Sequence, residues 1–146
     1  MTEQKISEKM SSFSRPMIST MFHIDFEWLM ENDQNWHISL SGYLCEKHRM
    51  FFDTTKGHQM IDSINPKTGE VIQTDQLMDI LMNHCAKQDN FIPPNGTLTD
   101  SVFRLFLSNG NQPLNAEEIG KIINRSPETI LKTLSGPRIY KGIKPL

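Results

Sequence analysis

The chain has 146 residues, of which 37% are hydrophobic and 22% charged, with a formal net charge of −2. This length and composition fit one globular domain, or two small domains that share a core. No apolar run approaches the roughly 20 residues that a membrane-spanning helix needs, and the N-terminus lacks the basic-then-apolar pattern of a secretory signal. We therefore expect a cytoplasmic protein whose two distant cysteines form no structural disulfide.

The N-terminal stretch carries the first structural signals. Residues 1–20 are polar and weakly patterned, so we expect them to be disordered. Residues 22–30 form the first dense apolar run, in which Asp25 can cap a short helix. Residues 23–26 also alternate as a strand would. We favour the helix.

Three segments in the middle of the chain have the character of β-strands. Residues 36–44 alternate for part of their length, at Trp36, Ile38 and Leu40, which predicts a strand, whereas residues 43–44 fit either a strand or a helix. Residues 60–64 and 70–73 flank the segment 65–69, whose sequence Asn-Pro-Lys-Thr-Gly is a strong turn signal. The two flanking segments are therefore expected to pair as a hairpin.

A helix is predicted next, beginning at Asp75 or the residue before it and continuing through Cys85. The proline-containing segment 91–96 follows, and we place a boundary between two units there. The first unit is a small N-terminal α+β module over residues 21–92. The second is a helical domain over residues 97–146, so the expected fold is mainly α, and α+β overall.

Both cysteines stand beside histidines in the sequence. Cys45 precedes His48 by three positions, and His84 directly precedes Cys85. Two thiolates and two imidazoles can form a closed tetrahedral zinc site, which leaves no position for a catalytic water. Adjacent residues of a helix point about 100° apart, so His84 and Cys85 can share an ion only if the helix frays there. The pattern predicts zinc as a cofactor, held by these four residues.

Other interpretations of the cysteines stay open. His58 could replace His84 as a ligand, or Cys85 could be a small buried hydrophobe with Cys45 incidental. The sequence also has no Gly-rich phosphate-binding loop and no serine in a nucleophile elbow. We therefore do not expect an enzyme.

Three helices in series are predicted in the C-terminal domain, at roughly residues 99–108, 115–123 and 126–135. Asn115 can cap the second helix, and Glu118 can reach back to the cap's own N–H group. A Ser-Pro pair suits the start of the third helix, and a Gly-Pro pair suits its end. The apolar positions of the last two helices are Leu114, Ile119, Ile122, Ile123, Ile130, Leu131 and Leu134.

The stretch 114–134 resembles the helix-turn-helix of bacterial regulators and sigma-factor DNA-binding domains. In that family a small residue in the first helix lets the second helix pack closely, and Gly120 stands at that position. Asn124 stands at the turn position usually held by glycine. Arg125 and Thr133 depart from the pattern, because the family usually has apolar residues there. The family's core positions are occupied by Ile119, Ile123 and Ile130.

Basic residues concentrate at the C-terminal end of the chain. From residue 125 onward there are five basic residues and one acid, a net charge of +4, so the total of −2 leaves −6 for the rest. A DNA-facing surface needs such a concentration, although a solvated basic tail would produce it too. The five basic residues are Arg125, Lys132, Arg138, Lys141 and Lys144.

Together these features predict a small DNA-binding protein, with duplex DNA as its partner and a homodimer or protein partner at the N-terminal module. We expect residues 137–146 to form a basic arm that Ile139 or Tyr140 anchors beside the reading helix. The alternative is a protein–protein adaptor that has lost DNA contact, which the acidic Glu128 early in the reading helix favours. RNA binding through the basic C-terminal residues is a third interpretation. The expected DNA contacts are Lys121, Arg125, Glu128, Thr129, Lys132, Thr133, Arg138, Lys141 and Lys144.

Overall fold

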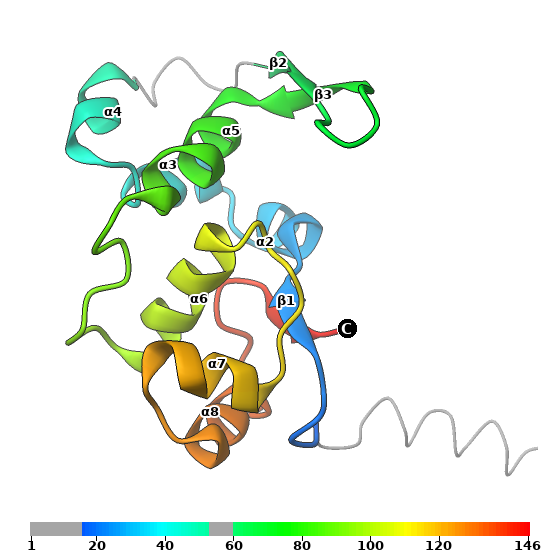
Figure 1. Ribbon diagram of the computed structural model, residues 1–146, viewed down its shortest axis with the longest axis vertical. Coiled ribbons are helices and arrows are strands. Elements are labelled where there is room, and N and C mark those ends of the chain that lie inside the picture. The colour runs from blue at the N-terminus through cyan, green and yellow to red at the C-terminus, as the bar shows by residue number, and fades with distance from the viewer. Residues whose placement is uncertain (1–15, 53–59) are drawn as a thin grey trace, which may run out of the picture.

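A computed structural model of the protein describes residues 16–52 and 60–146. Within these residues the chain is an α+β protein, with seven α-helices, one short 3₁₀ helix and two small antiparallel sheets (Figure 1). The elements are β1 (Phe22–Ile24), α2 (Phe26–Asn32), α3 (Trp36–Ser41), α4 (Glu46–Phe51), β2 (Met60–Ile64), β3 (Val71–Asp75), α5 (Gln76–Asn83), η2 (Cys85–Lys87), α6 (Leu98–Ser108), α7 (Ala116–Ile123), α8 (Pro127–Leu134) and β4 (Ile143–Pro145).

The N-terminal apolar run contains both a strand and a helix. The expectation of disorder at residues 1–15 lies outside the described residues, and Thr20 closes a turn onto Met17 before β1 begins. In β1 the side chains of Phe22 and Ile24 are buried. Asp25 then caps α2, as predicted, by accepting a hydrogen bond from the Trp28 N–H at 3.0 Å.

The prediction of a strand at residues 36–44 is wrong. The first six of these residues form helix α3, and the residues after it make turns. A strand would place Trp36, Ile38 and Leu40 on one face. Instead Trp36 and Leu40 lie one helical turn apart and are buried, whereas the Ile38 side chain is 56% exposed. The alternating residues also fit a helical i, i+4 pair, and tertiary packing selects the helix.

The predicted hairpin is present, and the helix after it ends earlier than expected. Strands β2 and β3 pair in register from Met60 opposite Asp75 to Ile64 opposite Val71. The Asp75 side chain caps α5 by accepting from the N–H of Met78, as predicted. Helix α5 stops at Asn83, and Cys85 begins the 3₁₀ helix η2.

Three helices follow segment 91–96, close to the predicted ranges, and each begins with a side-chain cap. Thr97 caps α6, and Asn115 and Glu118 form the predicted capping box at the start of α7. Ser126 caps α8, in which Pro127 is the first residue. We call α6, α7 and α8 the three-helix unit.

The junction between α7 and α8 is tight. Asn124 ends α7 in the left-handed conformation with φ of 57°, as its turn position predicted. Gly120 is buried there: a Cβ atom would lie 2.5 Å from the Arg125 carbonyl oxygen and 3.5 Å from Ile130. Ile122, predicted on the apolar face, is 55% exposed. The buried face of α7 carries Ala116, Ile119 and Gly120, and Ile122 lies outside that face.

The C-terminal residues form a strand, which corrects the prediction of a basic arm. Lys141 and Gly142, both at positive φ, turn the chain, and β4 then pairs with β1 so that Ile143 lies opposite Ile24. The anchor is therefore Ile143, which is 3% exposed, whereas Ile139 is 37% exposed. An added Cβ at Gly142 would lie 2.9 Å from the Asp25 carbonyl oxygen, so this approach requires glycine.

The buried side chains form one hydrophobic cluster that draws on both halves of the chain. Phe103 and Phe106 of α6 are fully buried in it, and α6 lies between the α7–α8 pair and the elements α2 to α5 (Figure 1). Phe91 and Ile92 of the segment that we expected to separate two units pack against the same cluster. The two halves therefore share a core. We call α2 to η2, residues 26–52 and 60–87, the α2–η2 region.

Candidate metal centre and interaction surface

Three of the four predicted metal ligands meet between α4 and η2. The Cys45 Sγ atom lies 3.1 Å from Nδ1 of His48 and 3.4 Å from Sγ of Cys85. The Cys85 Sγ atom lies 3.6 Å from the same histidine nitrogen. All three potential ligand atoms are within 4.8 Å of one another, an arrangement that is compatible with a metal ion.

Local structure places each member of this group. Cys45 is the residue before α4, and its carbonyl accepts the Arg49 N–H at 2.8 Å, so His48 lies almost one helical turn further on. The Arg49 guanidinium also donates to the Leu44 carbonyl at 3.0 Å and ties the helix to the preceding turn. Cys85 begins η2 and is buried in the hydrophobic cluster.

The observed distances are close to those of a tetrahedral zinc site. Bond lengths of about 2.3 Å to sulfur and about 2.0 Å to nitrogen imply ligand separations of about 3.8 Å for two sulfurs and about 3.6 Å for sulfur and nitrogen. The three measured separations differ from these values by about half an ångström or less. Small side-chain movements would suffice for one ion to contact Cys45, His48 and Cys85.

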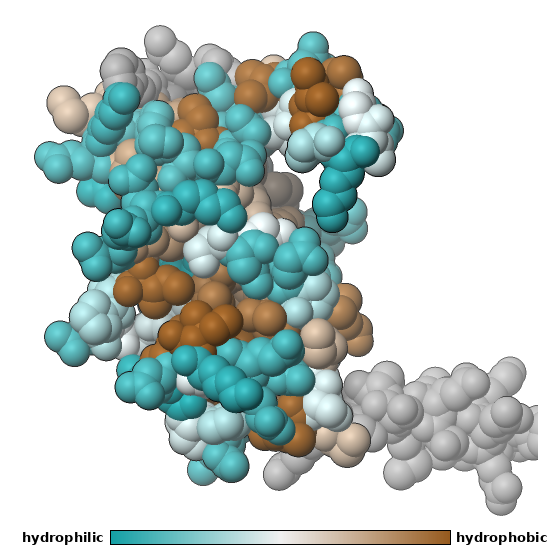
Figure 2. Space-filling model, viewed as in Figure 1, coloured by the Kyte–Doolittle hydropathy of each residue, from teal (hydrophilic) through white to brown (hydrophobic). Residues whose placement is uncertain are grey.

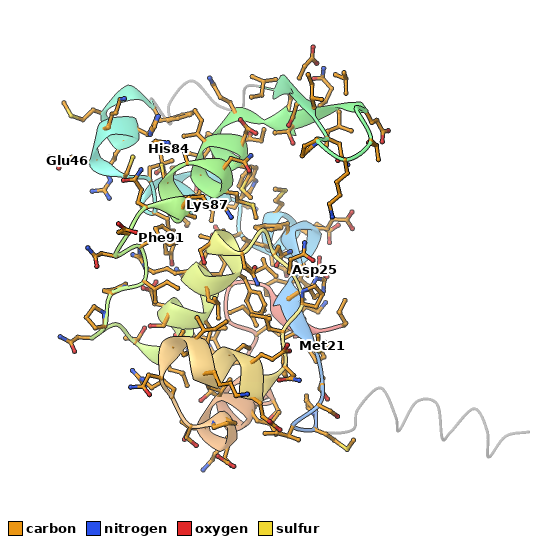
Figure 3. The ribbon with its side chains drawn as sticks, in the orientation of Figure 1. Met21, Asp25, Glu46, His84, Lys87 and Phe91 are labelled. Atoms are coloured by element: carbon orange, nitrogen blue, oxygen red, sulfur yellow. The ribbon has the colours of Figure 1, made fainter. Side chains whose placement is uncertain are left out.

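His84, the fourth predicted ligand, lies beside the group and is not part of it. Its ring centroid is 4.5 Å from that of His48, edge to face, and its Nε2 is 3.2 Å from the Gln88 side-chain nitrogen. Figure 3 shows His84 in the space between α4 and α5. The chain leaves the α-helix at this point, as sharing an ion required, but His84 remains exposed while Cys85 is buried. His58 lies outside the described residues.

The surroundings favour different protonation states for the three groups. Burial raises the pKa of the Cys45 thiol, but hydrogen bonds from the N–H groups of His48 and Lys47 and from the Cys85 thiol outweigh it and lower the pKa overall. Burial raises the pKa of Cys85 and lowers that of His48, which nearby His84 lowers further. A thiolate at Cys45 and a neutral imidazole at His48 are the forms that bind metals.

Most of the predicted DNA contacts lie on the outside of the α7–α8 pair. Thr133 is half-buried and its hydroxyl donates to the Thr129 carbonyl, while the Arg125 guanidinium donates to the Gly96 carbonyl at 3.0 Å. The guanidinium of Arg138 lies 5.4 Å from the centre of the Tyr140 ring. The exposed members of the predicted set on this side are Lys121, Arg125, Glu128, Thr129, Lys132 and Arg138.

Two predicted contacts, Lys141 and Lys144, remain at least partly exposed but bond to other residues of the protein. Lys141 donates to the Tyr43 hydroxyl, and the Lys144 ammonium lies 3.4 Å from a carboxylate oxygen of Asp25. The cause is the pairing of β4 with β1, which directs these side chains toward α2 and α3 (Figure 3 labels Asp25). This placement corrects the expectation that both lysines would lie beside α8.

A polar network that the sequence did not predict surrounds Tyr43. The Tyr43 hydroxyl donates to Asp100 at 2.9 Å, and Arg104 donates to the other oxygen of the same carboxylate at 2.7 Å. Burial and the hydrogen bond to Asp100 raise the pKa of Tyr43, so it remains a neutral phenol. The i, i+4 spacing of Asp100 and Arg104 was a readable signal, but Tyr43 is 57 positions away from Asp100.

A groove of about 550 Å³ lies between the hairpin, α2 and α5. Four methionines line it, and Met60 is more than half exposed. Figure 2 shows hydrophobic surface over the hairpin, where Ile64 and Val71 are also exposed. The four methionines in the groove are Met30, Met60, Met78 and Met82.

Comparison with known proteins finds no family model, no curated protein and no solved structure that matches this chain. In the part of the chain that the structure describes, no helix combines the length and the apolar character needed to cross a membrane.

Proposed function

We propose that the protein is a small DNA-binding protein, which uses α7 and α8 as a helix-turn-helix and a zinc ion as a structural cross-link in its N-terminal half. The two parts of this proposal rest on different residues, so each has its own test.

The zinc part is supported by the convergence of Cys45, His48 and Cys85 within 4.8 Å. Thiolate and imidazole ligands suit zinc, whereas magnesium and calcium prefer oxygen. The ion would join the start of α4 to η2, two segments separated by 40 positions in the chain. His84 could supply the fourth ligand if its side chain turned away from Gln88.

Metal analysis of the purified protein tests this part. We expect about one zinc per chain, and loss of that zinc in Cys45→Ser because the variant lacks one of the two thiolates. His84→Ala is the comparison variant. Weaker zinc binding in it would show that the fourth predicted ligand takes part, and unchanged zinc binding would show that it does not. A protein that takes up no zinc from solution, or a Cys45→Ser variant that binds it as tightly as the parent, would refute the zinc proposal.

The DNA part rests on the close packing of α8 on α7 at Gly120. The small residue and the left-handed turn at Asn124 bring the helices together as the helix-turn-helix resemblance implies. One face of α8 buries Ile130 and Leu134, and the opposite face exposes Glu128, Thr129 and Lys132. A helix held in this way is suited to insertion into the major groove.

The charges around α8 suit a modest number of phosphate contacts. Lys121, Lys132 and Arg138 are exposed on this side, and Arg125 is exposed although its guanidinium also bonds to Gly96. Glu128 opposes them: its own N–H and the Ser126 hydroxyl lower its pKa, so it is a carboxylate at the start of α8. We assign Glu128 a base-reading role, since carboxylates accept hydrogen bonds from cytosine N4.

Salt-dependent binding to random duplex DNA tests the DNA part. Each phosphate contact contributes about 0.9 to the slope of log K against log salt. We expect the double substitution Lys132→Ala and Arg138→Ala to weaken binding and to lower the slope by roughly one unit per lost contact. Lys67→Ala, in the distant hairpin loop, removes the same kind of charge and should leave the slope unchanged. No binding by the parent at about 50 mM salt would refute the proposal.

A protein–protein adaptor is the second candidate, and the methionine-lined groove favours it. Methionine side chains adapt to differently shaped partners, and large exposed apolar surfaces mark interaction sites. Lys141 and Lys144 also bond to other residues of the protein, so two of the charges expected to meet DNA already have partners. If the parent fails to bind duplex DNA, the adaptor becomes the preferred function.

A further inference from the structure

The two cysteine sulfur atoms are close enough to react with each other. The Cys85 thiol contacts the Cys45 sulfur at 3.4 Å, and a disulfide would require the two atoms to approach by about a further 1.4 Å. Cys45 is only half-buried at the start of α4, whereas Cys85 is fully buried. The pair therefore has one sulfur that small solutes can reach and a second directly behind it.

A polar pocket leads to this pair from solvent. Its volume is about 300 Å³, and both cysteines line it together with Glu46, Arg49 and Gln88. Hydrogen peroxide is a small polar oxidant that fits such a pocket. The pocket is open at the surface beside α4, near the position of Glu46 in Figure 3.

We propose that Cys45 and Cys85 are a peroxide-reactive pair that forms a reversible intramolecular disulfide. This inference rests on the proposed zinc site only for its consequence: the disulfide would consume two of the three metal ligands, so zinc binding and the oxidised state exclude each other. The pair would thus regulate the metal centre.

The reaction proceeds in two steps. The Cys45 thiolate attacks one oxygen of hydrogen peroxide, the O–O bond breaks, and the departing hydroxide takes a proton to become water, which leaves Cys45 as a sulfenic acid. The Cys85 sulfur then attacks the Cys45 sulfur and displaces hydroxide, which takes the Cys85 proton to become a second water. Two electrons pass from the two thiols to the peroxide.

The first measurement uses the unaltered protein, both zinc-loaded and metal-free. After hydrogen peroxide we expect the monomer to be about 2 Da lighter, the mass of two hydrogens, with both thiols lost and both restored by dithiothreitol. In the zinc-loaded sample, a metal-sensitive dye should record about one zinc released per disulfide. Covalent dimers, or irreversible gain of oxygen at Cys45 in place of the disulfide, would overturn the inference.

Two variants separate the roles of the cysteines. Cys85→Ser should stop at the Cys45 sulfenic acid, which dimedone traps, because the second sulfur is missing. Cys45→Ser should react far more slowly, because the remaining thiol is buried. Equal peroxide reactivity in the two variants would contradict the order of the steps.

The outcomes keep this inference distinct from the zinc proposal. A metal-free protein that binds no zinc but still forms the disulfide refutes the zinc site and leaves the reactive pair in place. A zinc-binding protein whose metal-free form yields no disulfide with peroxide refutes the reactive pair alone. Oxidised protein that binds zinc as tightly as the reduced form refutes the mutual exclusion.

Discussion

The three-helix unit and the α2–η2 region are built in different ways. In the three-helix unit each helix has at least eight residues and begins at a side chain that accepts a backbone N–H, namely Thr97, Asn115 or Ser126. In the α2–η2 region, Asp25 and Asp75 cap α2 and α5 in the same way. However, α3 and α4 have six residues each, and within the described range neither has a side-chain hydrogen bond at its N-cap. Helices of this length are marginal by themselves in both regions, and α3 and α4 also lack the local stabilisation that a side-chain cap gives.

The difference shows where each region obtains its order. The three-helix unit combines local capping with a shared apolar face. The α2–η2 region depends on contacts between distant segments: the cluster of Cys45, His48 and Cys85, and the hydrogen bond from Tyr43 to Asp100 of α6. We therefore expect substitutions at long-range contacts to affect both regions and substitutions at caps to have smaller effects.

The largest expected effect comes from Phe103, the α6 residue where the two regions meet. Its ring is fully buried, with its centroid 5.2 Å from that of Tyr43. Phe103→Ala should reduce the free energy of unfolding by about 3–5 kcal/mol. Both tryptophans lie in α2 and α3, so fluorescence reports the α2–η2 region while circular dichroism reports all the helices. Coincident shifts are expected, and an unchanged fluorescence midpoint would mean that the two regions unfold independently.

The next effect concerns the tight junction inside the three-helix unit. Gly120→Leu should reduce the free energy of unfolding by roughly 1–3 kcal/mol, because the added side chain overpacks the space beside Ile130 and the Arg125 carbonyl. Gly136→Leu is the matched control, since an added Cβ there would lie 3.7 Å from its nearest neighbour. Urea denaturation measures both. Equal stability of the two variants would place Gly120 outside the helix contact.

A smaller effect distinguishes the two regions at their caps. Asn115→Ala removes the capping box of α7 and should cost about 1 kcal/mol. Asn35→Ala changes the same residue type at the N-cap of α3, where the side chain makes no capping hydrogen bond, and should cost about 0.5 kcal/mol or less. A larger loss at Asn35 than at Asn115 in urea denaturation would reverse the comparison.

The smallest effect is a dependence on pH at the start of α2. The Trp28 N–H and the Lys144 ammonium lower the pKa of Asp25 in the folded protein. A lowered pKa stabilises the fold above the unfolded value of about 3.9, and this stabilisation is lost as pH falls through the folded pKa. Asp25→Asn keeps a capping oxygen but removes the charge, so stability should fall slightly at pH 7 and less at pH 2.5. An equal loss at both pH values would contradict the ionic contribution.

Several local features were predictable because they depend on residues within about four positions of one another. The capping box at Asn115 and Glu118, the left-handed turn at Asn124 and the hairpin at residues 60–75 all follow from such signals. The pairing of Cys45 with His48 is also local, since both belong to one turn at the start of α4. Two of the three residues of the candidate metal centre were therefore present as a sequence motif.

The remaining features required the tertiary structure. The side chains of Trp36 and Leu40 fit a strand or a helix, and burial against the shared core selects the helix. The pairing of β4 with β1 joins the two ends of the described chain, and only that pairing brings Lys144 to Asp25. No pattern within a few residues encodes such contacts, because they depend on how all the intervening elements pack.

The metal centre shows most clearly which features the sequence determines and which features the tertiary structure decides. The sequence by itself determined that cysteine and histidine occur together at two places and that the second place lies at the end of a helix. Only the folded chain decided that Cys85 turns inward to meet Cys45 while His84 remains exposed beside Gln88. The physical reason is that neighbouring residues point in different directions, and the apolar core accepts the small thiol of Cys85 at that position.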